Sequence, residues 1–234
     1  MEKIDKSNEE QIDKQIKRLK IKSIFIAIGI AITIIAIVVV INILRYIKPP
    51  LYQYKPVIYL YPTETTEVTV KVGRPENLTH TYPKYENEWK VIANPNGDLT
   101  DVETGRNLYC LYWEGINTVK PKMNEGFIVK GEDTIKFLEE KLEMLGLNER
   151  EANEFIIYWL PKLESNKYNY IRFQTMEEIE ENMPLEVTPK PDTIIRVLME
   201  YKALEEPIEI KEQNLAIPER TGFTLVEWGG TELK

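Results

Sequence analysis

An unbroken stretch of uncharged, mostly apolar residues at 23–44 is the strongest pattern in the chain. As an α-helix its 22 residues would extend about 33 Å, enough to cross a hydrocarbon core about 30 Å thick. A cleaved signal peptide has a shorter apolar run and a small-residue cleavage site, and neither feature is present here. We therefore predict one uncleaved transmembrane helix at 23–44, with the lipid bilayer as its partner.

The flanks of this segment differ in positive charge, which predicts its orientation. Five basic residues precede it and three follow it over a similar span: Lys14, Lys17, Arg18, Lys20 and Lys22, then Arg45, Lys48 and Lys55. Because the more basic flank stays in the cytoplasm, we expect residues 1–22 to be a cytoplasmic tail. Residues 45–54, with their Pro49-Pro50 pair, are expected to form a linker outside the cell membrane.

From residue 55 onward the apolar residues recur with a period of two, which is typical of β-strands. Turn signals at Asn96-Gly97 and Thr104-Gly105 separate some of these segments. The predicted strands are 57–61, 67–72, 78–82, 89–93, 108–114 and 127–130. Short strands joined by tight turns predict an antiparallel sheet or a small sandwich.

The period then changes to 3.6, which predicts a helical hairpin over residues 133–146 and 148–161. Asn148 with Glu151 has the spacing of a capping box, as does Thr175 with Glu178 at the start of a later short helix. Further strands are expected at 168–174, 194–201 and 223–228, and an irregular connection at 203–219. The fold class is therefore α+β, with a single domain at 55–234 in which the hairpin packs on the sheet.

The charge is distributed unevenly, which limits the possible partners. Residues 1–48 carry a net charge of +4 and the remainder −12, so the larger part would repel the phosphates of a nucleic acid. Cys110 is the single cysteine and His80 the single histidine, which excludes disulfides within the chain and zinc sites built from cysteines or several histidines. We expect no metal and no cofactor, a buried Cys110, and a packed His80 on the face of Leu78 and Tyr82.

No phosphate-binding loop, dinucleotide-binding glycine motif or nucleophile elbow is present. The most suggestive polar positions are the neighbours Trp113-Glu114 and Glu227-Trp228. Glycosidases use two carboxylates that flank a sugar, so Glu114 and Glu227 are the candidate catalytic residues and Trp113, Trp228 and Arg220 the candidate binding residues. The alternative is structural: the two glutamates are exposed acids at strand ends or partners of arginines in ion pairs.

Three segments together resemble a bacterial family of secreted or membrane-anchored proteins without an established activity. The segments are KPVIYLYP at 55–62, YWEG at 112–115 and GFTLVEWGG at 222–230. The resemblance covers residues 55–230 and implies one contiguous domain, without assigning any catalytic residue.

These patterns predict a single-pass protein of the bacterial cell envelope whose C-terminal domain faces outward. The leading expectation for its function is a non-catalytic module that contacts cell-wall polymer or another envelope protein. The 13 tyrosines of the chain allow glycan binding by stacking, although they also fill sheet faces. The alternative is a carboxylate-dependent glycan hydrolase at the cell surface that uses Glu114 and Glu227, so the enzyme question stays open at this point.

Overall fold

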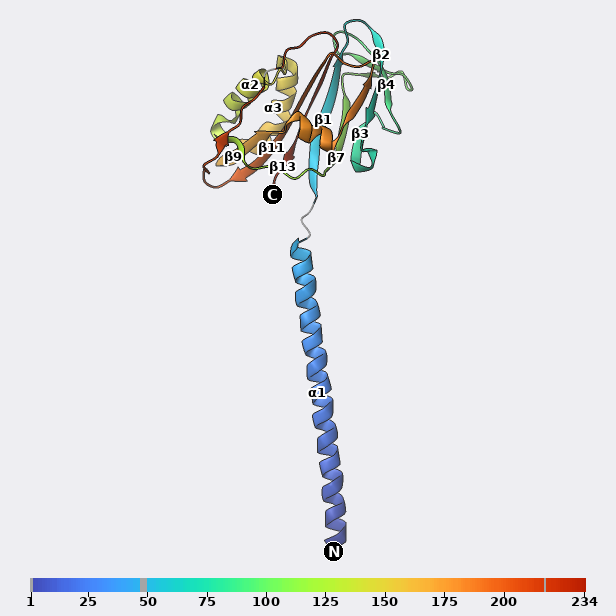
Figure 1. The fold of residues 1–234 in the computed structure, drawn as a ribbon, viewed down its shortest axis with the longest axis vertical. Coiled ribbons are helices and arrows are strands. Elements are labelled where there is room, and N and C mark those ends of the chain that lie inside the picture. Colours follow the sequence, from blue (N-terminus) through green and yellow to red (C-terminus); the bar gives the residue numbers. More distant parts are fainter. Residues whose placement is uncertain (1, 47–49, 217) are drawn as a thin grey trace. The chain divides into compact units, whose positions relative to one another are not determined.

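The structure, a computed structural model, describes residues 2–46, 50–216 and 218–234 (Figure 1). The chain separates into two compact units, Met1–Pro49 and Pro50–Lys234. Each unit is described by itself.

The first unit is a single helix, α1 (Glu2–Tyr46). Its segment Ile16–Asn42 is long and apolar enough to cross a membrane, and none of its most apolar window is buried. Two polar side chains in its apolar part bond to the helix itself: Thr33 Oγ1 donates to the Gly29 carbonyl and Asn42 Nδ2 to the Val38 carbonyl, each over 2.9 Å. Polar groups satisfied in this way are compatible with a hydrocarbon environment.

The second unit is built on an eight-stranded and a five-stranded sheet. The strands of the larger sheet, in spatial order, are β12 (Lys211–Glu212), β8 (Glu125–Lys130), β9 (Tyr168–Phe173), β11 (Thr193–Leu204), β13 (Thr224–Glu232), β1 (Leu51–Tyr61), β7 (Leu111–Asn117) and β3 (Leu78–Tyr82). Those of the smaller sheet are β10 (Leu185–Thr188), β2 (Thr66–Val72), β4 (Trp89–Ala93), β5 (Leu99–Asp101) and β6 (Asn107–Leu108). Among the strands of the described residues, only β11 with β13 and β12 with β8 pair in parallel. The predicted α+β class with a mainly antiparallel sheet is therefore confirmed.

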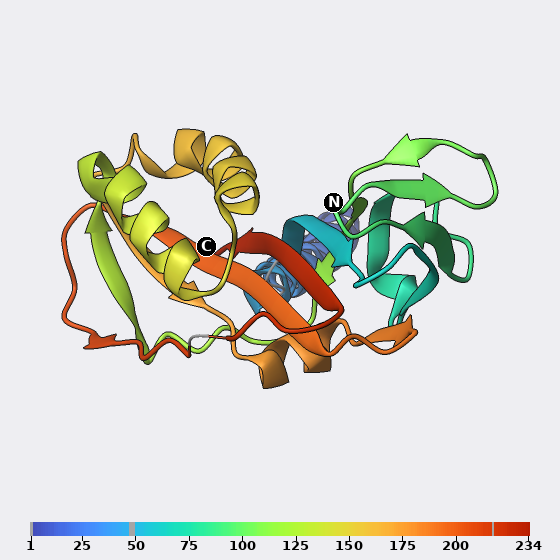
Figure 2. The same cartoon turned by 90° about the horizontal axis from the view of Figure 1, so that it is seen from above.

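The helices lie on both sides of the larger sheet. Figure 2 shows α2 (Thr134–Met144) and α3 (Glu149–Leu163) on one side and the short α4 (Met176–Asn182) on the other. Two single-turn 3₁₀ helices, Pro75–Asn77 and Gly131–Asp133, precede β3 and α2. The predicted helical hairpin therefore forms and packs on the sheet.

The alternation of side chains along β1 divides the core into two layers. Val57 and Tyr59 pack with α2 and α3, whereas Ile58 and Leu60 pack with the smaller sheet. We call the side of the larger sheet that carries Val57 and Tyr59 the helix face, and the side that carries Ile58 and Leu60 the sandwich face. Successive residues of a regular strand point to opposite faces, so neighbours along β1 from Val57 to Leu60 belong to different layers.

Local signals in the sequence agree closely with the structure. Both predicted capping boxes form, at Asn148 with Glu151 and at Thr175 with Glu178. Gly97 in the β4–β5 turn has a φ of 89° and Gly146 after α2 a φ of 86°, conformations that favour glycine.

The structure differs from the prediction in the bounds of two segments and in three short strands. Strand β1 begins at Leu51, so residues 51–54 belong to the domain rather than to a linker; residues 47–49 of that linker lie outside the described residues. The strand expected at 108–114 is divided between β6 and β7, which belong to different sheets. The strands β5 and β10 were not predicted, and the short β12 interrupts the connection expected at 203–219.

Candidate functional site

The structure does not bring the two candidate catalytic glutamates together. In β13, Glu227 lies opposite Ile58 of β1, and Leu111 of β7 also lies opposite Ile58. These three residues therefore share the sandwich face. Glu114, three positions after Leu111, points to the helix face. With the sheet between them, Glu114 and Glu227 do not flank one sugar, so their prediction as a catalytic pair is wrong.

Glu227 is instead the centre of a buried ion pair. Its side chain is 0% exposed, and it accepts hydrogen bonds from Arg196 Nε over 2.6 Å and Trp113 Nε1 over 2.8 Å. Arg196 also binds Glu180 over 2.7 Å and donates to the Met183 carbonyl over 2.8 Å. The alternative given for the glutamates, a structural ion pair with an arginine, describes Glu227.

The candidate binding residues also have structural contacts. Trp113 and Trp228 are each 0% exposed, so neither ring offers a surface on which a sugar could stack, and their prediction as binding residues is wrong. Arg220 binds the carboxylate of Glu151 over 2.6 Å, at the start of α3. Its guanidinium also lies 5.5 Å from the centre of the Tyr61 ring.

A groove on the helix face, lined by tyrosines and containing Glu114, is the best candidate for a ligand site. We call it the tyrosine groove. It has a volume of about 510 Å³ and is lined by Lys55, Val57, Tyr82, residues 107–110, Tyr112, Glu114 and Tyr158. Its side chains come from β1, β3, β6, β7 and α3 and from the β6–β7 connection.

A bulge in β1 shapes the floor of this groove. The pairing register of β1 shifts between Tyr54 and Val57, and Lys55 has a φ of 59°, the single positive value at a non-glycine residue in the described chain. The Lys55 amide donates to Glu114 Oε1 over 3.1 Å. This conformation is unfavourable for a non-glycine residue and persists only where surrounding contacts hold it. Residues of this kind are frequent at functional sites.

The Lys55 side chain is held by aromatic rings. Its Nζ lies 5.6 Å from the centre of the Tyr112 ring and 5.9 Å from that of Tyr158, both within the range of cation–π attraction. Burial, together with the nearby Glu114 carboxylate, raises the pKa of the Tyr112 hydroxyl. That hydroxyl therefore stays protonated and able to donate a hydrogen bond.

Two tyrosines and the single histidine border the groove with exposed surface. Tyr82 is 51% and Tyr109 45% exposed. The His80 side chain is 71% exposed, and its Nδ1 lies 3.8 Å from Glu114 Oε2. The expectation of a packed, inward His80 is therefore wrong: β3 is the edge strand of the larger sheet, and its Leu78 packs against the core while His80 does not.

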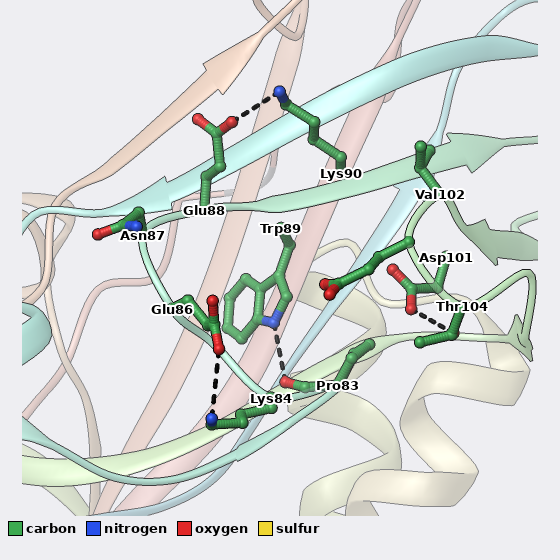
Figure 3. A pocket seen from close by; sticks show the side chains of 11 residues that line it. Pro83, Lys84, Glu86, Asn87, Glu88, Trp89, Lys90, Asp101, Val102 and Thr104 are labelled. Atoms are coloured by element: carbon green, nitrogen blue, oxygen red, sulfur yellow. Dashed lines mark hydrogen bonds and ion pairs between the residues drawn. The ribbon is translucent and has the colours of Figure 1, made fainter.

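A second hollow lies on the smaller sheet around Trp89 (Figure 3). Its volume is about 440 Å³. Trp89 is buried and donates to the Pro83 carbonyl over 2.9 Å, while Glu88 pairs with Lys90 and Glu86 with Lys84. Four of its charged side chains pair within the hollow and its aromatic ring is buried, so it offers a ligand less than the tyrosine groove does.

A third polar cluster is fully enclosed on the sandwich face, beneath α4. Arg172 binds Glu178 over 2.7 Å and Glu200 over 3.2 Å. Burial raises the pKa of Glu200. Burial alone would also raise the pKa of Glu178, but hydrogen bonds from Thr175 and Arg172 lower it overall. These groups join α4 to the sheet and have no access for a ligand.

Two further candidates, the Cys110 thiol and a metal site, do not provide a functional site. Cys110 is buried, as expected, and burial raises the pKa of its thiol to about 12, so it is a packed thiol rather than a nucleophile. Among the described residues, no three histidine, cysteine or carboxylate side chains gather into a metal site.

Comparison with known proteins adds no identification, because no protein-family model, curated protein or solved structure matches this chain. The resemblance to a family of secreted or membrane-anchored bacterial proteins stays a prediction.

Sequence reasoning missed Lys55, Tyr82, Tyr109, Tyr112 and Tyr158 as members of one site. A usable signal was present, since Tyr112 and Glu114 are separated by two positions in a predicted strand and must share a face. The contribution of Tyr109 depends on the change of sheet between β6 and β7, which has no local sequence signature.

Proposed function

We propose that this chain is a single-pass, membrane-anchored module of the bacterial cell envelope that binds wall polymer or another envelope protein without catalysing a reaction. Segment Ile16–Asn42 supports the anchor because it combines spanning length with apolar side chains. The greater number of basic residues before the apolar segment favours a cytoplasmic N-terminus and an outward domain.

The observation that carries the binding role is the tyrosine groove. It combines exposed aromatic rings at Tyr82 and Tyr109 with a fixed ammonium at Lys55 and a carboxylate at Glu114. Concave sites lined by aromatic side chains and a few oriented polar groups are typical of ligand binding. Binding rather than hydrolysis is favoured because Glu114 has no second carboxylate positioned across the groove among its lining residues.

Two measurements on the full-length protein test this proposal. In cells stripped of their wall, added protease should degrade a C-terminal epitope tag and leave an N-terminal tag intact; protection of the C-terminal tag would contradict the orientation. In nanodiscs, the protein should be retained by purified wall fractions without releasing soluble sugars. Released sugars would favour the hydrolase, and absence of retention would contradict binding to wall polymer.

A further inference from the structure

We propose that the tyrosine groove recognises a saccharide that carries a carboxylate, with the acid group bound by Lys55 and the sugar ring placed against Tyr109 and Tyr82. This inference rests on the proposed binding function and names the chemical class of its ligand.

Lys55 determines the charge of the ligand. Its Nζ is held at 5.6 and 5.9 Å from the ring centres of Tyr112 and Tyr158, and among the described residues no carboxylate lies within 4.0 Å of it. Its ammonium therefore keeps three hydrogen-bond donors for an outside group. An anionic ligand group would meet a cation that is already positioned, which reduces the entropy lost on binding.

The positions of the tyrosines indicate a sugar. Lys55 lies against Tyr112 and Tyr158, and Arg150 lies against one face of Tyr109. Tyr82 and Tyr109 nevertheless keep exposed surface at the border of the same groove. The face of an aromatic ring is electron-rich and attracts the polarised C–H groups of a sugar ring. The carboxylate of Glu114 and the amide of Asn107 also line the groove and can accept hydrogen bonds from sugar hydroxyls.

The local charge differs from that of the domain as a whole. Residues 49–234 carry a net charge of −12, which disfavours anions at long range. At the groove, however, Lys55 lies over Tyr112, Lys162 lies 5.0 Å from the Tyr158 ring centre and Arg150 lies 5.6 Å from that of Tyr109. Two carboxylates also lie here: Glu114 lines the groove, and Glu154 pairs with Arg150 over 3.4 Å. Because charges beyond about 8 Å are largely screened at physiological ionic strength, the three cations and two carboxylates give the site a positive local balance.

The test uses the full-length protein in nanodiscs and a glycan array of oligosaccharides that contain galacturonic, glucuronic or muramic acid. Each is paired with its methyl ester, which keeps the ring but removes the charge. We expect at least one acid to bind about tenfold more tightly than its ester, as a charge-assisted hydrogen bond implies. Equal binding of acids and esters, or binding of an acidic peptide but of no acid sugar, would overturn the inference.

Variants assign the roles within the groove. Lys55→Met should weaken acid binding about tenfold and leave ester binding unchanged, whereas Lys55→Arg should restore the preference for the acid. Tyr109→Ala should weaken acid and ester binding alike, by about fivefold. Lys84→Met, at an exposed lysine in the other hollow, is the matched control and should have no effect.

The outcomes separate this inference from the proposed function. A misfolded Lys55→Met would lose ester binding as well, and Lys55→Arg would then carry the charge test. If wall fractions still retain the protein but no acid sugar is preferred, the ligand class is wrong while the binding function stands. If wall fractions do not retain the protein, the proposed function itself fails.

Discussion

Glu227 illustrates how the layer in which a side chain lies determines its role. Its carboxylate is removed from water and is compensated by Arg196 and the indole of Trp113. A buried ion pair is weak evidence for net stability, but removing one partner leaves a charge buried and uncompensated. The residue is therefore expected to be intolerant of substitution without taking part in any reaction.

We predict that Glu227→Ala lowers the free energy of unfolding by about 3 kcal/mol, because it removes the fully buried carboxylate that faces Arg196 Nε and the Trp113 indole, and leaves the partly exposed Glu180 as the remaining acid partner of Arg196. The measurement is urea denaturation of the full-length protein in detergent, followed by tryptophan fluorescence. All four tryptophans of the chain lie in the unit Pro50–Lys234 and are buried there, so the signal reports on this unit. Glu103→Ala, at an exposed position, should change the free energy by less than about 0.5 kcal/mol; equal effects would contradict the structural role of Glu227.

At the residue scale, the sequence predicted burial and capping better than it predicted the site. The apolar neighbours of Cys110 indicated its burial, and the spacing of Asn148 and Glu151 indicated their reciprocal bonds. The neighbours Trp113-Glu114 and Glu227-Trp228 were misleading because adjacent strand residues point to opposite faces. The tryptophan that binds Glu227 is Trp113, which is 114 positions away, and only the strand order brings the two together.

Helix α3 contributes both to the core on the helix face and to the tyrosine groove. It contributes Phe155 and Trp159 to the core and Tyr158 to the groove. Its first turn is held by the capping box, in which Asn148 Oδ1 accepts from the Glu151 amide over 2.9 Å and Glu151 Oε2 accepts from the Asn148 amide over 2.8 Å. Glu151 also binds Arg220, so this turn connects the helix to the segment that precedes β13.

We predict that Asn148→Ala lowers the free energy of unfolding by about 1 kcal/mol, the usual effect of losing a side-chain cap. Asn153→Ala provides the matched control, since it is the same substitution at an exposed position inside α3. Alanine is the better helix former there, so this variant should be neutral or slightly more stable. Urea denaturation followed by tryptophan fluorescence distinguishes the two, and a control that loses as much stability as Asn148→Ala would contradict the capping role.

At the element scale, long periodic segments were predicted well and short strands were not. A continuous apolar run identified β1, the period of two identified β2 and β4, and the period of 3.6 identified α2 and α3. Strands β5 and β10, with three and four residues, are too short for a period to be recognised, and they form because β4 and β2 offer them open edges. The break between β6 and β7 arises from a change of sheet, which is a property of the tertiary fold.

The whole molecule combines a helix with exposed apolar side chains and a domain that has its own two-layered core. In water, the apolar surface of Ile16–Asn42 would be unfavourable, because exposing it costs about 25 cal/mol per Å². Of the described side chains in this segment, the large apolar ones are all more than 40% exposed. This segment is long and apolar enough to cross a bilayer, which would cover such a surface.

We predict that the combined substitutions Ile30→Arg, Ile34→Arg and Ile37→Arg prevent membrane insertion, whereas Ile34→Arg alone does not. Leucine-like residues favour insertion by about 0.3–0.6 kcal/mol each, which sums to roughly 8 kcal/mol over this segment, while each central arginine costs about 3 kcal/mol. One arginine therefore leaves insertion favourable, and three cancel it.

The matched control replaces Ile16, Leu19 and Ile21 by arginine. These positions lie before the uncharged stretch, where added arginines reinforce the basic flank. In carbonate-washed membranes, the single variant and the control should remain in the pellet and the central triple variant should not. Retention of the triple variant would mean that the domain binds membranes by another surface, and α1 would then not be the anchor.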